Sequence, residues 1–217
     1  MECYKYYLPG GKEIDQEQFI EFYSKVYFFL NRNHKLEDEI EALISKDSLT
    51  EHELMEILKW KLGAPQYVDY TLKTRYHTIE ACALVKKLSG PKPVNVCADD
   101  FLREIAGGQF KGIGPVYAIT LLFFLSKGCY PIYDKYAHIA LKVILDHMDY
   151  TGIVTDSDIS REFHNSSHSK RYPHDYKAYI DKMKAVFGEK YIKDRRIDQA
   201  LWTYGHLFND TRTNHQK

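Results

Sequence analysis

Cysteine is scarce in this chain of 217 residues, and the few cysteines are not grouped. The four of them stand far apart and include no Cys-x-x-Cys pair: Cys3, Cys82, Cys97 and Cys129. Cysteine-ligated metal modules need short, regular spacings, so this arrangement excludes them. It predicts free thiols in a reducing compartment.

Long apolar runs and an excess of one charge are also missing. No apolar stretch reaches the roughly 18 residues that a membrane span needs, and the opening residues MECYKYYLPGG contain no signal-peptide core. We therefore expect a soluble, cytoplasmic protein that does not bind membranes. Lysine plus arginine and aspartate plus glutamate number 30 each, and this balance argues against a strongly basic DNA-binding protein.

The charges are nevertheless distributed unevenly. Acidic residues outnumber basic ones from Glu13 to Glu56, and the reverse holds from Lys170 to Arg196. This asymmetry fits a protein that presents one face to a polyanion, and it fits ordinary solvated helix faces equally well.

Helical signals are frequent, whereas repeats, low-complexity linkers and alternating strand patterns are absent. Thr50 and Glu53 form a capping box, which predicts a helix that Gly63 ends. Asp15 begins another expected helix, with a buried face made of Phe19, Phe22, Val26, Phe29 and Leu30. Further helices are expected over residues 36–44, 67–75, 78–88, 95–105, 176–187 and 196–208. The pattern predicts an all-α protein with about nine or ten helices.

Two elements in the middle of the chain indicate a binding or catalytic site. Gly112 and Gly114 flank Ile113 in a turn that leads into an apolar helix, and Pro115 suits the first turn of that helix. Such a turn directs backbone N–H groups toward one point, which suits a phosphate. Twenty residues after Gly114, Asp134 precedes a second helix, whose dipole favours an ionised carboxylate.

Together these elements resemble the helix-hairpin-helix DNA glycosylase superfamily, the relatives of endonuclease III, the adenine glycosylase and the 8-oxoguanine glycosylases. The family pattern is Leu-Pro-Gly-(Val/Ile)-Gly-x-x-x-Ala, and this chain has FKGIGPVYA at residues 110–118, which follows the pattern from Gly112 to Ala118. Its later (Val/Ile)-Asp at a helix start is matched by PIYD at residues 131–134, with only the tyrosine between isoleucine and aspartate departing from it.

The resemblance implies two helical lobes flanking a groove. Residues 46–130 would form the lobe that ends in the hairpin, and residues 1–45 with 131–217 the lobe that carries Asp134. The partner would be double-stranded DNA, bound by a monomer through Lys111, Gly112, Ile113, Gly114 and Val116. Asp134 would assist hydrolysis of the N-glycosidic bond of a flipped, damaged base. A Na⁺ or K⁺ ion on the hairpin carbonyls would be the only metal.

Two departures narrow the expected activity. Bifunctional members carry a lysine where this chain has Val116, and valine cannot form the Schiff base, so the resemblance implies a monofunctional enzyme. The cysteines of the family's iron–sulfur cluster are absent. Lys61 is considered as a nucleophile that could act in place of the missing hairpin lysine.

His164 and His168 have the i, i+4 spacing of metal ligands, but they lie in a polar loop without a third ligand, so no side-chain metal site is predicted.

Several other residues have competing interpretations. Asp134 itself could be a plain helix cap. Contacts with the pocket or with a phosphate are considered for five residues: Trp60, Lys61, Lys135, His138 and Tyr204. The competing interpretation is core packing for Trp60 and Tyr204 and a surface position for His138. The main alternative function is a non-catalytic hairpin module that binds the DNA backbone, and the third is an all-α interaction protein. Nothing in the sequence identifies the base.

Overall fold

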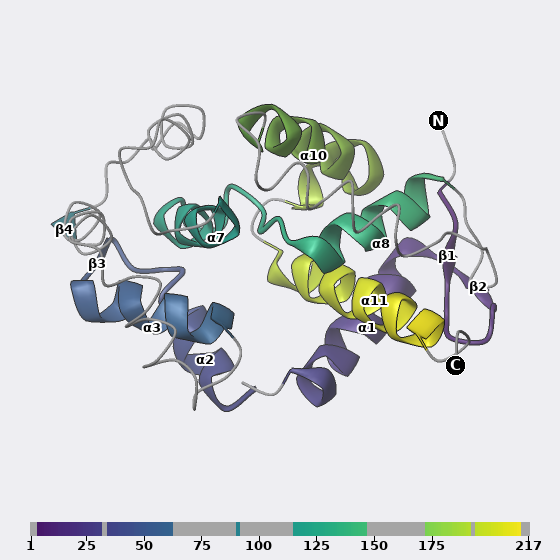
Figure 1. Ribbon diagram of the computed structural model, residues 1–217, viewed down its shortest axis with the longest axis horizontal. Coiled ribbons are helices and arrows are strands. Elements are labelled where there is room, and N and C mark those ends of the chain that lie inside the picture. Colours follow the sequence, from purple (N-terminus) through teal and green to yellow (C-terminus); the bar gives the residue numbers. More distant parts are fainter. Residues whose placement is uncertain are drawn as a thin grey trace. The chain divides into compact units, whose positions relative to one another are not determined.

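The computed structural model describes residues 4–31, 34–62, 90–91, 115–146, 172–191 and 194–213. These residues are mostly helical, which confirms the helical character expected from the sequence (Figure 1). The α-helices are α1 (Gln16–Leu30), α2 (His34–Ala42), α3 (Glu51–Leu62), α7 (Pro115–Leu125), α8 (Lys135–Leu145), α10 (Tyr172–Phe187) and α11 (Arg195–Thr213), with a 3₁₀ helix η1 at Gly188–Tyr191. Hairpin residues 111–114 and the helices expected between residues 67 and 105 lie outside the described residues.

Two small antiparallel ribbons, which no alternating pattern in the sequence predicts, accompany the helices. β1 (Tyr6–Tyr7) pairs with β2 (Glu13–Ile14), and β3 (Ser48–Leu49) pairs with β4 (Gly90–Pro91). Each strand has two residues, which is too short to produce an alternating apolar pattern.

The chain divides into two compact units. Unit 1 consists of Met1–Leu30, Tyr133–Ser169 and Asp175–Lys217, and unit 2 of Asn31–Ile132 and Lys170–His174. The sequence expectation grouped residues 31–45 with the first of these, whereas the structure places α2 beside α3. The physical reason is a buried hydrogen bond of 2.9 Å from Trp60 Nε1 to Glu37 Oε2, which ties the two helices together.

In unit 1, α11 packs against both α1 and α8 (Figure 1). The buried face of α1 follows the helical repeat and consists of Phe19, Ile20, Tyr23, Ser24 and Tyr27. The expected face is wrong at Phe22 and Phe29, which are 38% and 88% exposed. Tyrosine rings supply the apolar surface in their place, and the Tyr23 hydroxyl donates to the Tyr7 carbonyl at 2.7 Å.

In unit 2, α3 packs against α7. The predicted capping box of α3 is confirmed, because the Thr50 N–H donates to Glu53 at 2.8 Å and the Glu53 N–H donates to the Thr50 hydroxyl at 3.2 Å. α7 is apolar around its whole circumference, and Ala118–Leu125 is completely buried. A helix of this composition belongs in a core, and the complete burial of Ala118–Leu125 shows that α7 is a core helix.

Candidate active site around Asp134

Asp134 is the N-cap of α8, as its sequence context predicts. Its backbone is extended, with φ −134° and ψ 179°, and its Oδ1 accepts hydrogen bonds of 3.0 Å from the N–H groups of Tyr136 and Ala137. The residue is 9% exposed. The carboxylate is therefore fixed in position at the positive end of a helix, where the peptide dipoles favour its ionised form.

The side chains on either side of the cap are also fixed. Tyr133, immediately before it, is buried and stacks on Tyr179 of α10, with ring centroids 4.3 Å apart. The Tyr133 hydroxyl lies 2.9 Å from Nδ1 of His138, one turn into α8. The sequence predicts a pocket or phosphate contact or a surface position for His138, and nothing in it identifies Tyr133 as the partner.

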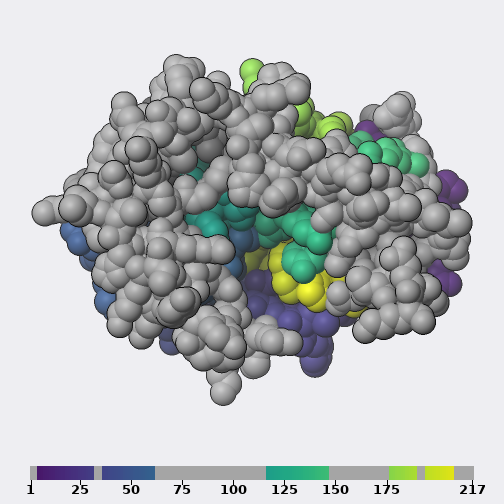
Figure 2. Space-filling model, viewed as in Figure 1, coloured from purple at the N-terminus to yellow at the C-terminus, as the bar shows by residue number. Residues whose placement is uncertain are grey.

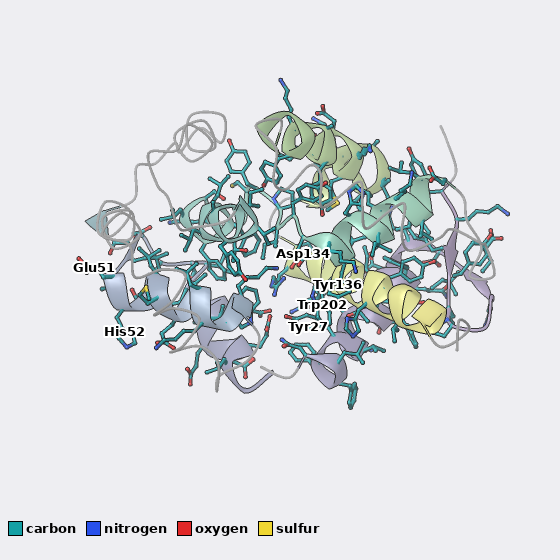
Figure 3. The ribbon with its side chains drawn as sticks, viewed as in Figure 1. Tyr27, Glu51, His52, Asp134, Tyr136 and Trp202 are labelled. Carbon is teal, nitrogen blue, oxygen red and sulfur yellow. The ribbon has the colours of Figure 1, made fainter. Side chains whose placement is uncertain are left out.

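Aromatic side chains from α1, α8 and α11 contact one another at the first turn of α8, the helix that Asp134 caps (Figure 3). The indole of Trp202 on α11 stacks on the His206 imidazole at 4.9 Å and 8°, and meets Tyr136 of α8 edge-on at 5.6 Å. Tyr27 of α1 also meets the indole edge-on, with ring centroids 5.3 Å apart. We call Tyr27, Tyr136, Trp202 and His206 the aromatic cluster.

The aromatic cluster is partly accessible. Trp202, Tyr136 and His206 are partly exposed, and Tyr27 is buried. In the space-filling view, atoms of α1, α8 and α11 lie next to one another on the drawn face (Figure 2). Tyr136 belongs to the aromatic cluster through its ring and to the cap through its backbone N–H, which donates to Asp134 Oδ1.

Two cations border the aromatic cluster. The Arg195 guanidinium lies 5.6 Å from the centroid of the Tyr27 ring and forms an ion pair with Asp198. Lys135 Nζ lies 5.9 Å from the centroid of the Tyr136 ring. A planar ligand would therefore meet aromatic surface, one fixed carboxylate and cationic groups within the same region.

Gly205 determines how closely α8 approaches α11. A Cβ atom at this position would lie 2.0 Å from the Tyr136 carbonyl oxygen and 2.7 Å from its carbonyl carbon. Only glycine therefore permits this contact, which brings the first turn of α8, and Asp134 with it, onto α11. The sequence analysis placed the end of the last helix soon after this glycine, whereas α11 continues through it to Thr213.

The other residues considered from the sequence occupy different surroundings. Tyr204 is buried in unit 1 against Phe19, with ring centroids 5.2 Å apart. In unit 2, Trp60 is buried with its ring edge-on to Phe124 at 5.9 Å, Lys61 lies in the last turn of α3, and Val116 lies in the first turn of α7. Lys111, Gly112, Ile113, Gly114, His164 and His168 lie outside the described residues.

Among the described residues, no three histidine, cysteine or acidic side chains are grouped so as to hold a metal ion, and Cys129 is a free thiol. None of the helices in the described part of the chain is both long and apolar enough to cross a membrane. Comparison with protein-family models, curated proteins and solved structures found no match to this chain.

Proposed function

We propose that this protein is a monofunctional DNA N-glycosylase of the helix-hairpin-helix type, acting in base-excision repair. The observation that supports it most directly is a carboxylate fixed at the start of α8, two residues before Tyr136 of the partly exposed aromatic cluster. Base excision requires both features, because the extruded base needs a surface to stack on and the sugar needs a fixed negative charge beside it.

In the proposed reaction, the C1′–N bond breaks and its electron pair leaves with the base. Positive charge develops on the sugar, and Asp134 stabilises it. Water adds to C1′, and Asp134 orients it and accepts its proton, while the departing base is protonated from solvent. The cap hydrogen bonds prevent the carboxylate from reorienting during these steps.

Aromatic stacking supports the choice of a nucleobase as the ligand. Base–aromatic stacking contributes about 1–3 kcal/mol per base and tolerates every base, because each has a π face. Extruding a nucleotide from the duplex costs a few kcal/mol. Stacking on Trp202 and Tyr136 would therefore offset much of the extrusion cost.

Two further parts of the proposal derive from the resemblance. Lys111, Gly112, Ile113 and Gly114 would bind a DNA phosphate through backbone N–H groups, with Na⁺ or K⁺ on their carbonyls. Val116 stands where bifunctional members have lysine, so the strand would not be cut by β-elimination.

A second candidate function has its own supporting observation. Asp134 Oδ1 makes two ordinary cap hydrogen bonds, which is the commonest use of aspartate at a helix start. If capping is its whole role, the protein is a non-catalytic hairpin module that binds the DNA backbone.

A panel of duplexes carrying oxidised, alkylated, deaminated or mismatched bases tests the proposed reaction. Under single-turnover conditions, we expect one class of duplex to lose its base and the strand to break only after alkali. Strand cleavage without alkali, with an adduct trapped by borohydride, would contradict the monofunctional assignment and direct attention to Lys61. Duplex binding without base release from any substrate would favour the hairpin module.

A further inference from the structure

We infer that Tyr133 and His138 form a clamp that positions the Asp134 carboxylate. The clamp joins the residue before the cap to the first turn after it, and its catalytic meaning depends on the function proposed above. Neither residue needs to touch the substrate, so both are positioning residues.

The clamp occupies the two positions that control how a chain enters a helix. With Asp134 as N-cap, Tyr133 is the N′ residue and His138 is N4. Apolar side chains at N′ and N4 commonly contact each other and fix the entry angle. Here a hydrogen bond of 2.9 Å between the Tyr133 hydroxyl and His138 Nδ1 accompanies the ring contact, whose centroids are 5.8 Å apart. A hydrogen bond fixes direction more narrowly than apolar contact does.

The clamp is anchored outside α8 by a stack of tyrosines. Tyr133 lies nearly parallel to Tyr179 at 4.3 Å and 27°, and to Tyr176 at 6.2 Å and 29°. All three rings are at most 3% exposed. Because the Tyr133 ring cannot rotate in this packing, its backbone and that of the following Asp134 are held against α10.

Asp134 is thereby constrained from both sides. Its Oδ1 is held by two N–H groups that follow it in the chain, and its backbone by the ring that precedes it. Catalytic groups need placement within about 0.5 Å, and an error of about 1 Å can reduce a rate by about a hundredfold. The cap hydrogen bonds hold only the side chain of Asp134. The clamp holds the backbone that carries this side chain, and this is its proposed role.

Amide hydrogen exchange at Tyr136 and Ala137 tests the clamp without requiring catalysis, because these two N–H groups hold Asp134. Tyr133→Phe keeps the stacked ring and removes the hydroxyl, and His138→Leu removes its partner. His138→Asn is the conservative variant, since its side-chain amide can place a polar atom close to where Nδ1 lies. Single-turnover base release and duplex binding are measured on the same proteins.

Tyr23→Phe is the matched control. Tyr23 lies in unit 1, is fully buried, and loses a comparable hydroxyl hydrogen bond, of 2.7 Å to the Tyr7 carbonyl. That bond ties α1 to β1 and not to α8. The control therefore reports what the loss of any buried tyrosine hydroxyl does to exchange throughout the unit.

We expect Tyr133→Phe and His138→Leu to speed exchange at Tyr136 and Ala137 about tenfold more than Tyr23→Phe does. Base release should fall about five- to tenfold with unchanged duplex affinity, and His138→Asn should recover most of both losses. Exchange in Tyr133→Phe equal to that in the control would overturn the inference, and so would faster exchange with an unaltered rate. If the wild type releases no base, the proposed function fails, and the exchange measurement alone decides whether the clamp holds Asp134.

Discussion

The contact between Gly205 and α8 makes a quantitative prediction about stability. In Gly205→Ala the new Cβ would lie 2.0 Å from the Tyr136 carbonyl oxygen, whereas ordinary contacts begin at 3.4 Å. The two helices must separate by the difference, 3.4 − 2.0 = 1.4 Å, or deform. The obstructing atoms belong to the backbone, so no side chain can rotate to relieve the overlap.

Two opposing effects determine the magnitude. Overpacking a core costs typically about 1–3 kcal/mol, and the upper part of that range applies where backbone is displaced. Alanine in place of glycine within a helix contributes about 1 kcal/mol in the other direction. Because the overlap is severe, we expect the free energy of unfolding to fall by about 2–3 kcal/mol.

Urea denaturation measures the change, with Gly10→Ala as the comparison. Gly10 has φ +95° and no atom within 4 Å of a Cβ, so its substitution introduces backbone strain alone, at about 1 kcal/mol. A Gly205→Ala protein that is as stable as the wild type, or more stable, would refute the close approach of α8 to α11. It would also remove the structural reason for placing the first turn of α8, with Tyr136, beside Trp202.

Three further predictions concern other parts of the molecule. The hydrogen bond from Lys46, with those from Thr50, lowers the pKa of Glu53 to about 2, so the stabilisation from the ionised carboxylate is present above pH 4.5 and is lost as the pH falls through 2. Urea titrations of Glu53→Gln should show a loss of less than about 1 kcal/mol in the free energy of unfolding at pH 7, because solvent screens the group. Below pH 2 the substitution should cause no loss. Trp60→Phe removes the hydrogen bond to buried Glu37 and should destabilise unit 2 by about 1–3 kcal/mol, which a lower denaturation midpoint would show. An unchanged midpoint would show that this hydrogen bond does not join α2 to α3. Phe29→Ser should change stability by no more than about 0.5 kcal/mol, because the side chain is 88% exposed, and a larger loss would show that Phe29 is part of a core.

Local signals in the sequence predicted the helix starts. Thr50 with Glu53, and Asp134 before its apolar helix, became caps because each depends only on residues within one turn. Asp15 also caps its helix, accepting a hydrogen bond of 2.8 Å from the Gln18 N–H. Such interactions are formed by neighbours in the chain, so they can be recognised without knowledge of the fold.

Non-local features could not be predicted in the same way. No local pattern singles out Trp202, and its contacts with Tyr27 and Tyr136 follow from the approach of α11 to α1 and α8. Gly205 was interpreted as part of a helix end, although its role depends on a carbonyl 69 residues earlier in the chain. The buried face of α1 differs from the expected one because Tyr23 and Tyr27 are buried where Phe22 and Phe29 were expected, and the Tyr23 hydroxyl finds a carbonyl partner in β1 that no local pattern encodes.

The central claim is that Asp134 is a catalytic carboxylate and not only a helix cap. Asparagine caps helices about as well as aspartate, so Asp134→Asn keeps the two cap hydrogen bonds and removes the charge. The decisive measurement is single-turnover base release by wild type and Asp134→Asn on the duplex that the wild type processes. Duplex affinity and the free energy of unfolding are measured in parallel. We predict that base release falls at least a hundredfold, that duplex affinity stays within about twofold of wild type, and that the free energy of unfolding stays within about 1 kcal/mol of it. Equal release by both proteins would contradict the account and leave Asp134 as the cap of α8.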